Sequence, residues 1–354
     1  MTTGPSVRPR FAILGAGFWA RFQLAAWCEL GTADCVAIYN RTRSRAERLA
    51  AEFHVPAVYD DPAALLDHQA VDFVDVITSP DTHAALVELA RERGLPVICQ
   101  KPMATSLDEA VEMVQACAEA RVPFFVHENF RWQRAVREAK AVLDAGTIGR
   151  PFRARLEFTS SFPVFENQPF LRDLREFILT DVGSHMLDMA RFLFGEVEAL
   201  YCQIERVHPA IRGEDVATVL LRTAQGTTVV CEMSFASRLE DEAFPETLLR
   251  VEGSAGSLEL KKGHWVRVTT AEGTLSRRVE PARFSWSDPS YDVVQDAIVR
   301  CNQNLLGGIT GSAPAETTGE DNLRTVRLVF GSYTSARTDA VFHPPRTRGI
   351  ARYP

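Results

Sequence analysis

Short apolar runs alternate with amphipathic stretches in the first third of the chain. Continuous apolar runs at residues 11–14, 35–39, 73–77, 97–99 and 124–126 predict strands that are buried on both faces. The stretches 19–30, 44–53, 82–93 and one opening at Ser106 predict helices between them. This alternation is typical of a parallel sheet covered by helices, so an α/β Rossmann domain with a doubly wound parallel sheet is predicted.

The pattern changes after about Gly149, where the apolar runs become longer and often alternate with polar residues. Runs at 152–158, 200–207, 217–222, 227–235, 248–252 and 265–269 predict strands of a largely antiparallel sheet. Helices are expected at 180–194, 291–305 and 320–337. We therefore predict two domains, an α/β domain at 1–128 and an α+β domain at 129–354. The second domain holds a large, mostly antiparallel open sheet, and the C-terminal helices could pack back on the first domain.

Composition narrows the function classes. The 354 residues carry a formal net charge of -7, which disfavours a nucleic-acid or anionic-membrane partner. Seven scattered cysteines include no C-x-x-C pair, so we expect reduced thiols in a cytoplasmic protein rather than disulfides or a thiolate metal site. Apolar runs of about 18 residues, as a membrane span requires, do not occur.

The first motif with chemical meaning is Gly15-Ala16-Gly17-Phe18-Trp19-Ala20, which follows a predicted strand and opens a predicted helix. It fits the G-x-G-x-x-G/A fingerprint, in which glycines let the backbone approach a pyrophosphate at a helix N-terminus. With this fingerprint, the 1–128 domain is predicted to be a dinucleotide-binding Rossmann domain, and the 129–354 domain is expected to serve substrate binding and oligomerisation. The alternative is a glycine-rich turn without a ligand. The next strand ends in Asn40-Arg41 instead of the acidic residue that binds an adenosine ribose, which favours NADP weakly and leaves NAD open.

Two further strand ends supply candidate residues. Thr78 and Pro80, after the 73–77 strand, are candidates to line the cofactor, although this segment also fits a plain strand-to-helix turn. Gln100-Lys101 ends the 97–99 strand. A lysine at that edge can hold a substrate hydroxyl and stabilise developing negative charge, whereas an isolated Lys-Pro is usually surface.

The second domain contributes Asp181 and His185, which stand four residues apart and share one face of a predicted helix. An imidazole beside a carboxylate is a natural proton acceptor near neutral pH. The alternative is a structural Asp-His pair, and Asp188 one turn further on fits a packing or pairing role.

Together these motifs resemble the Gfo/Idh/MocA oxidoreductase family over nearly the whole chain. The matching segments are the glycine fingerprint, the T-x-P-x-x-H turn from Thr78 to His83, the family's E-K-P tripeptide at Gln100-Lys101-Pro102, and the D-x-G-x-H helix at Asp181-Gly183-His185. The resemblance implies that Lys101, Asp181 and His185 are catalytic and that Asn129 and Arg131 line the substrate site, or that Arg131 pairs structurally. It implies cofactor contacts from Gly15, Gly17, Phe18, Trp19, Asn40, Arg41, Thr78, Pro80, His83, Gln100 and Lys101.

One position departs from the family pattern, because Gln100 stands where the family has Glu. A neutral amide can still bond the nicotinamide ribose, but it cannot act as a charged partner for Lys101. Residues 97–103 and 127–129 are also similar to a bacterial branch of the family that uses NAD to oxidise the branched pentose apiose at C1 to a lactone. That similarity favours NAD, against the indication from Asn40 and Arg41.

The resulting hypothesis is an NAD(P)-dependent oxidoreductase that moves a hydride between the nicotinamide and a sugar or polyol hydroxyl. The alternatives are a dinucleotide-binding regulator without catalysis, a glycoside hydrolase that uses NAD transiently, and a non-redox isomerase. The expected partners are a small sugar or polyol and further copies of the chain, as a homodimer or homotetramer, without a metal.

Overall fold

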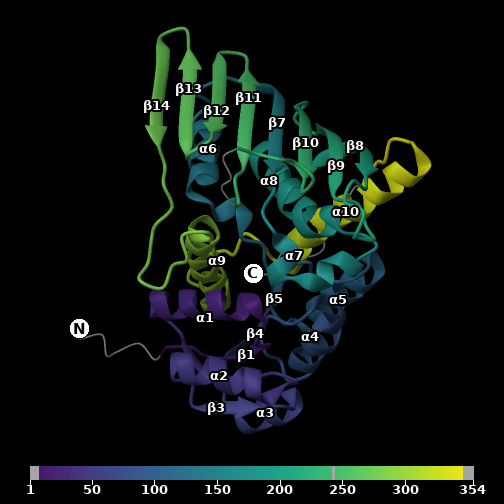
Figure 1. The fold of residues 1–354 in the computed structure, drawn as a ribbon. Coiled ribbons are helices and arrows are strands. Elements are labelled where there is room, and N and C mark those ends of the chain that lie inside the picture. Colours follow the sequence, from purple (N-terminus) through teal and green to yellow (C-terminus); the bar gives the residue numbers. More distant parts are fainter. Residues whose placement is uncertain (1–7, 241–243, 346–354) are drawn as a thin grey trace. The chain divides into compact units, whose positions relative to one another are not determined.

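The computed structural model describes residues 8–240 and 244–345 (Figure 1). It divides into two compact units, which are taken one at a time below. The first comprises Met1–Glu128 together with Ile298–Leu323, and the second comprises Asn129–Ala297 together with Arg324–Pro354. A segment close to the C-terminus therefore completes the N-terminal unit.

The first unit is built on a six-stranded parallel sheet in the order β3-β2-β1-β4-β5-β6. Its strands are β1 (Arg10–Leu14), β2 (Asp34–Tyr39), β3 (Ala57–Tyr59), β4 (Phe73–Val76), β5 (Val97–Gln100) and β6 (Phe124–His127). The strand order reverses between β1 and β4, and ligands of such sheets bind beyond the carboxyl ends of the strands at that point. The Rossmann prediction is confirmed, with β3 as a strand that the sequence pattern did not reveal.

Helices connect the strands of this sheet. They are α1 (Phe18–Leu30), α2 (Arg43–Phe53), α3 (Pro62–His68), the short η1 (Pro80–Thr82), α4 (His83–Arg91) and α5 (Leu107–Ala120). Ser106 caps α5 by accepting a hydrogen bond from the Glu109 amide at 3.2 Å, while the Glu109 carboxylate accepts from the Thr105 amide at 2.8 Å. Both ends of that exchange satisfy backbone N–H groups at the start of the helix.

The second unit holds an eight-stranded sheet in the order β14-β13-β12-β11-β7-β10-β9-β8. Its strands are β7 (Pro151–Thr159), β8 (Val197–Glu205), β9 (Val216–Thr223), β10 (Thr228–Ser234), β11 (Leu248–Gly253), β12 (Gly256–Lys261), β13 (Trp265–Thr270) and β14 (Gly273–Arg278). Neighbouring strands run antiparallel except β7 and β10, which pair in parallel. The mostly antiparallel sheet is as predicted, and β12 and β14 extend it.

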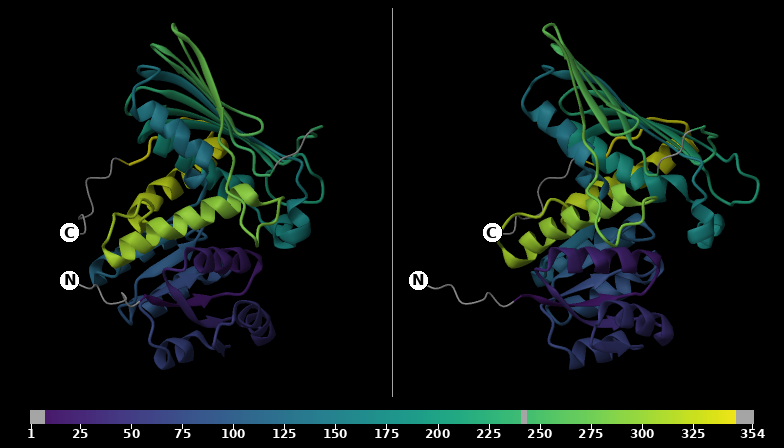
Figure 2. Two further views of the ribbon diagram at one scale, coloured as in Figure 1. Left: turned by 90° about the vertical axis from the view of Figure 1, so that its left-hand side faces the viewer. Right: turned by 60° about the vertical axis from the view of Figure 1, so that its left-hand side comes forward.

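One face of this sheet is covered by helices and the other is open (Figure 2). The helical segments of this unit are η2 (Phe130–Trp132), α6 (Arg134–Asp144), α7 (Val164–Asn167), η3 (Pro169–Asp173), η4 (Leu179–Gly183) and α8 (Ser184–Phe194). Two longer helices, α9 (Asp292–Thr310) and α10 (Gly319–Thr338), each run from one unit into the other. α6 packs on β12 and β13, and α8 packs on β7 and β10. Alternate residues of β9 and β10 are buried against this layer, which explains the period of two in their sequences. Within the described residues, no helix is long and apolar enough to cross a membrane.

Candidate functional site

The first glycine of the fingerprint is required by the backbone. Gly15 follows β1 with φ of +123°, and its amide donates to the carbonyl of Tyr39 at 2.8 Å. A Cβ at this position would lie 2.4 Å from the carbonyl oxygen of Ile77. Only glycine fits this close crossing of the loops that follow β1 and β4.

The second glycine is not explained by packing within the chain. Gly17 is the N-cap of α1, and a Cβ there would meet no described atom within 4 Å. Glycine has no side chain to cap the helix, so the backbone at this helix N-terminus can approach an anionic ligand closely. Ala20, one turn on, is fully buried, as the close helix packing of the fingerprint requires. This loop therefore fits a dinucleotide pyrophosphate.

Asn40 lies beside the same loop at the end of β2. Its Oδ1 accepts a hydrogen bond from the Ala16 amide at 3.0 Å, and its Nδ2 donates to the Thr42 carbonyl at 3.0 Å. Arg41 is exposed, and Arg43 pairs with Glu47. The Asn40 side chain thus fixes the glycine loop, a role that the sequence alone did not indicate.

The turn after β4 is tied to the turn after β5 by His83. Its Nε2 lies 3.1 Å from the Thr78 carbonyl oxygen, and its Nδ1 lies 3.1 Å from the Pro102 carbonyl oxygen. Burial lowers the pKa of His83, which favours the neutral ring. The Thr82 hydroxyl donates to that of Thr78 at 2.7 Å, which stabilises the same turn.

Gln100 and Lys101 end β5 at the same edge of the sheet. The Lys101 side chain is half-buried, and its backbone amide donates to Gln100 Oε1 at 2.9 Å. The first unit therefore brings together the fingerprint, Asn40, Thr78 and Lys101 beyond the carboxyl ends of adjacent parallel strands. Contacts of these residues with a cofactor, including one from Gln100 to a ribose, stay predictions.

In the second unit, Asp181 and His185 lie on either side of the start of α8. Asp181 belongs to η4, a turn of π-helix, and is half-buried, while His185 in the first turn of α8 is only 4% exposed. The imidazole stacks on the Phe130 ring with a centroid distance of 3.7 Å and an interplanar angle of 1°. Turns of π-helix are rare and are often found at functional sites. The spacing of polar residues in the sequence did not predict this turn.

Arg131 forms a buried ion pair with Asp188. Its Nε lies 2.7 Å from Asp188 Oδ2, and its Nη2 lies 2.5 Å from Oδ1, so the pair is bidentate. The Thr325 hydroxyl donates to the same carboxylate at 3.2 Å. This contact is the structural pairing considered for Arg131, and its place in the substrate site stays a prediction. This pair anchors η2, which carries Phe130, and Asn129 is buried immediately before it.

Glu214 is a residue of this site that the sequence analysis missed. Its Oε1 accepts hydrogen bonds from the amides of Phe177 and Leu179, at 3.1 and 3.2 Å, and from the Tyr333 hydroxyl at 2.7 Å. One buried carboxylate oxygen thus holds the backbone just before Asp181.

The pairing of Asp181 and His185 with Lys101 stays a prediction. Within the described residues, no cluster of three or more His, Cys, Asp or Glu side chains could hold a metal ion.

Comparison with known families matches both parts of the chain. Residues 9–128 match the model of the Gfo/Idh/MocA oxidoreductase family with an NAD-binding Rossmann fold, and residues 136–259 match a Gfo/Idh/MocA C-terminal domain. Two curated relatives are each 40% identical and are named D-apiose dehydrogenase. That from Rhizobium rhizogenes aligns over 92% of this chain and 94% of its own, and that from Paraburkholderia graminis over 95% and 90%. The resemblance drawn from the sequence is confirmed.

A solved structure of an oxidoreductase from Agrobacterium radiobacter, in complex with NAD+, L-tartaric acid and magnesium, is 38% identical. It superimposes with a TM-score of 0.93 over 95% of this chain and 98% of that one. A levoglucosan dehydrogenase in complex with NADH and levoglucosan superimposes with a TM-score of 0.84 at 20% identity, which supports the fold alone.

Proposed function

The chain belongs to the Gfo/Idh/MocA family of NAD(P)-dependent oxidoreductases, and from that premise we propose that it oxidises a sugar hydroxyl at an aldose C1. The observation that carries the redox assignment is the loop at Gly15 and Gly17, where the backbone requires one glycine and no packing contact within the described residues accounts for the other. That combination fits a dinucleotide and is not needed for folding alone.

The catalytic roles follow from the chemistry of three side chains. His185, held against Phe130, accepts the hydroxyl proton; Lys101 holds the reacting oxygen and stabilises its developing charge; and Asp181 orients the ring or the substrate. The bound nicotinamide supplies the hydride acceptor. The residues of the chain thus bind, orient and deprotonate.

The preferred dinucleotide is proposed to be NAD. Asn40 Oδ1 is engaged by the Ala16 amide, so this side chain fixes the loop rather than selecting a phosphate. The 38% identical structure from Agrobacterium radiobacter is a complex with NAD+. Exposed Arg41 is the group that would meet a 2′-phosphate, so measuring kcat/KM with NAD and NADP for the wild type and Arg41→Ala tests the choice. A preference for NADP that disappears in Arg41→Ala would reverse it.

The proposed substrate is D-apiose or a closely related aldose, with a lactone as the product. Support comes from the two D-apiose dehydrogenases, each aligned over at least 90% of both chains. A panel of aldoses and polyols, followed by absorbance of the reduced cofactor, tests the substrate. Steady reduction with apiose supports the proposal; dinucleotide binding without turnover on any member would favour a regulator, and glycoside cleavage without net reduction would favour a hydrolase.

The catalytic assignment is tested by His185→Ala and Lys101→Ala. Loss of the proton acceptor lowers rates by about 100- to 10,000-fold in comparable enzymes. We expect a fall of that order in kcat for His185→Ala, a similar fall for Lys101→Ala, and nearly unchanged dinucleotide binding in both. Unchanged turnover in both variants would contradict the assignment.

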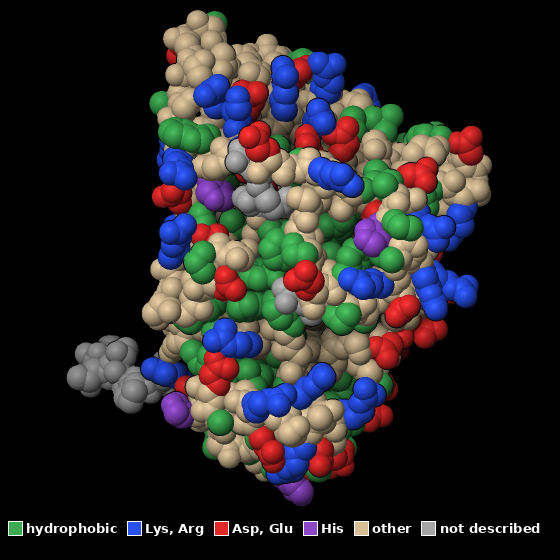
Figure 3. All heavy atoms as spheres, in the orientation of Figure 1, with side chains coloured by type: hydrophobic (Ala, Val, Ile, Leu, Met, Phe, Trp, Pro, Cys, Tyr) green, Lys and Arg blue, Asp and Glu red, His purple; other side chains and the backbone are tan. Residues whose placement is uncertain are grey.

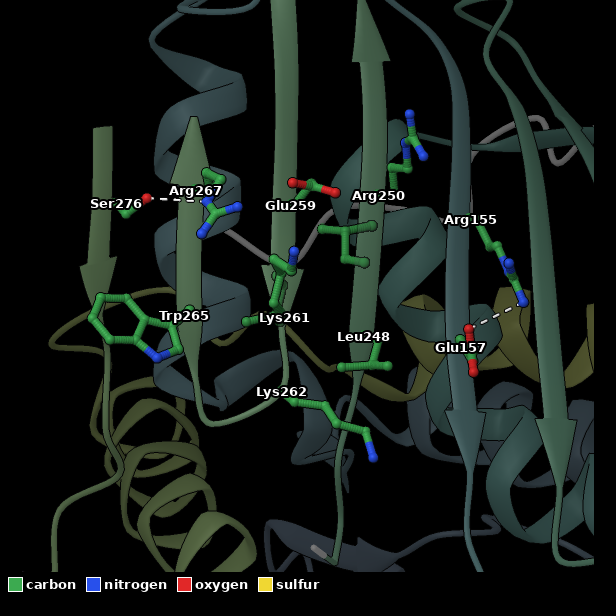
Figure 4. A pocket seen from close by; sticks show the side chains of 12 residues that line it. Arg155, Glu157, Leu248, Arg250, Glu259, Lys261, Lys262, Trp265, Arg267 and Ser276 are labelled. Atoms are coloured by element: carbon green, nitrogen blue, oxygen red, sulfur yellow. Dashed lines mark hydrogen bonds and ion pairs between the residues drawn. The ribbon is translucent and has the colours of Figure 1, made fainter. Parts of the chain in front are cut away.

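The open face of the eight-stranded sheet is proposed to join copies of the chain. It bears a surface hollow of about 680 Å³, lined by residues of β7, β11, β12, β13 and β14 and of the turn between β12 and β13 (Figure 4). Basic and acidic side chains intermix over these strands (Figure 3), and Trp265 stays 43% exposed. Light scattering after gel filtration should give a dimer or tetramer for the wild type and a smaller species for Trp265→Glu. A monomeric wild type would exclude this interface.

A further inference from the structure

Gln100 occupies the position before the proposed catalytic lysine, and its amide has neighbours on three sides. Oε1 accepts from the Lys101 amide at 2.9 Å. Nε2 donates to Gln23 Oε1 at 2.8 Å and lies 3.4 Å from His127 Nδ1. The side chain at position 100 must therefore accept one hydrogen bond and offer two N–H donors. A primary amide can do both, whereas an ionised carboxylate can only accept.

The orientation of Gln23 is set from its far side. Gln23 Nε2 donates to both carboxylate oxygens of Asp75, at 2.7 and 2.8 Å, and both side chains are buried. The Trp27 indole, which can only donate, binds the same carboxylate at 2.9 Å. An ionised Asp75 accepts only, so Gln23 must direct Nε2 toward it and present Oε1 to residue 100.

The orientation of His127 is set from its other side in the same way. Asn302 Nδ2 approaches the Gln23 carbonyl at 3.4 Å, so its Oδ1 faces His127 Nε2 at 2.9 Å. A neutral imidazole that donates through Nε2 carries a lone pair on Nδ1. Both side chains that face Gln100 Nε2, Gln23 and His127, therefore present an acceptor atom to it. In each case a hydrogen bond on the far side of the side chain fixes that orientation.

We propose that Asp75 and Gln23 are positioning residues for Lys101, and that they make Gln100 obligatory where the family has Glu. Three hydrogen bonds in series link Asp75 to Lys101. Gln23 donates to Asp75, Gln100 donates to Gln23, and the backbone amide of Lys101 donates to Gln100. Gln100 thus fits the hydrogen-bonding groups that surround it in this protein, and a Glu at this position would not. The inference rests on the proposed role of Lys101.

The polarity can be reversed by exchanging both ends of the chain. In Gln100→Glu, a carboxylate oxygen replaces Nε2 and faces Gln23 Oε1 across a partly buried 2.8 Å contact. In Asp75→Asn with Gln100→Glu, the new amide at position 75 donates to Gln23 Oε1, and Gln23 turns Nε2 toward the new carboxylate. That carboxylate also accepts from the Lys101 amide, and a protonated His127 would satisfy its remaining side.

The experiment is a double-mutant cycle assayed at pH 8.5, above the pKa of about 7 to which burial raises the Asp75 carboxyl. Gln100→Glu should lower kcat about 10- to 100-fold, the size of one or two buried hydrogen bonds to charged groups. Adding Asp75→Asn should restore kcat to within about 5-fold of the wild type, because the interaction is shared by the pair. Asp75→Asn alone should be impaired, since it inverts one end only.

A matched control is Gln69→Glu, which adds the same charge at a half-buried glutamine of the same unit and should leave kcat unchanged. If Gln100→Glu fails to fold, recovery of the folded state by Asp75→Asn tests the same coupling through circular dichroism and NAD+ titration. Wild-type activity in Gln100→Glu, or a double variant no better than the single one, would overturn the proposal. Unchanged turnover in Lys101→Ala would instead defeat the proposed function, while recovery of folding and NAD+ affinity in the double variant would still hold.

Discussion

The two regions that carry the proposed catalytic groups are held by different physical means. The turn with Lys101 is fixed mainly by neutral amides, whose donor and acceptor ends are set by one buried carboxylate, Asp75, and by His83, whose pKa burial lowers. The start of α8 with His185 is fixed by buried carboxylates, one paired with Arg131 and the other accepting backbone amides. In the first region, which we call neutral, each side chain must keep its role as hydrogen-bond donor or acceptor. In the second, charged region, each buried ion must keep its partner.

Removing one ion should have the largest effect. Arg131→Met leaves Asp188 buried without its bidentate partner, and breaking such a pair costs about 3–5 kcal/mol. Urea unfolding should show a loss of this size. The control is Arg43→Met, whose pair with Glu47 is exposed and contributes about 0–1 kcal/mol. Equal effects of the two substitutions would end the distinction between the regions.

In the neutral region, the largest effect should come from sterics rather than charge. Gly15→Ala combines a positive φ with a Cβ 2.4 Å from a carbonyl oxygen, so we expect a loss of about 2–4 kcal/mol in unfolding free energy. Gly17→Ala is the matched control, because its Cβ meets open space. It should leave stability nearly unchanged and weaken NAD+ at least about 10-fold. Equal losses of stability in both would contradict the loop assignment.

A smaller effect is expected when the charge of Glu214 is removed but its acceptor oxygen is retained. Glu214→Gln still offers a carbonyl to the Phe177 and Leu179 amides, so unfolding free energy should fall by only about 1–2 kcal/mol. Because these amides precede Asp181, kcat should fall more than the KM for sugar changes. A larger change in KM than in kcat would show that Glu214 does not position the proton-transfer groups.

The smallest effect should be a dependence of stability on pH in the turn after β5. Burial lowers the pKa of His83 below its unfolded value of about 6.5, so the folded state disfavours the proton. The stability that the neutral ring contributes is present above that unfolded value and is lost as pH falls through the folded pKa, with a slope of at most about 1.4 kcal/mol per pH unit. His83→Gln should reduce this slope in urea titrations at pH 5–7. An unchanged slope would show that His83 does not titrate with unfolding.

The sequence predicted those parts of the fold whose pattern is local. Continuous apolar strands, the alternation of β9 and β10, and the glycine fingerprint can all be read within a few residues. It missed β14, whose six residues are all exposed, and β3, whose three residues are half-buried, because neither carries a hydrophobic period. It also missed β12, which follows β11 after only two residues. Local pattern also predicted a helix at Asp181 and His185, without its π-helical turn.

Site residues were missed where their meaning lies in distant partners. The sequence pattern around Gln23 predicts a helix but gives this residue no special role. Its hydrogen-bond partners are 52 and 77 positions away. Glu214 acts on amides 35 and 37 positions before it. No spacing rule connects such positions, because the sheet order brings them together. Gln100 was noticed only as a departure from a family pattern, and its physical reason needed the surrounding donors and acceptors.

The return of residues 298–323 to the N-terminal unit has a consequence for biosynthesis. Asn302 contacts His127, the Thr317 hydroxyl donates to the Val126 carbonyl at 2.7 Å, and Phe125 bridges Thr318 along the edge strand β6. A ribosome that has released only the first 128 residues has therefore made a sheet whose last strand still lacks these partners. We expect this half to mature only when almost the entire polypeptide has emerged, so nascent chains stalled before that segment should remain sensitive to protease.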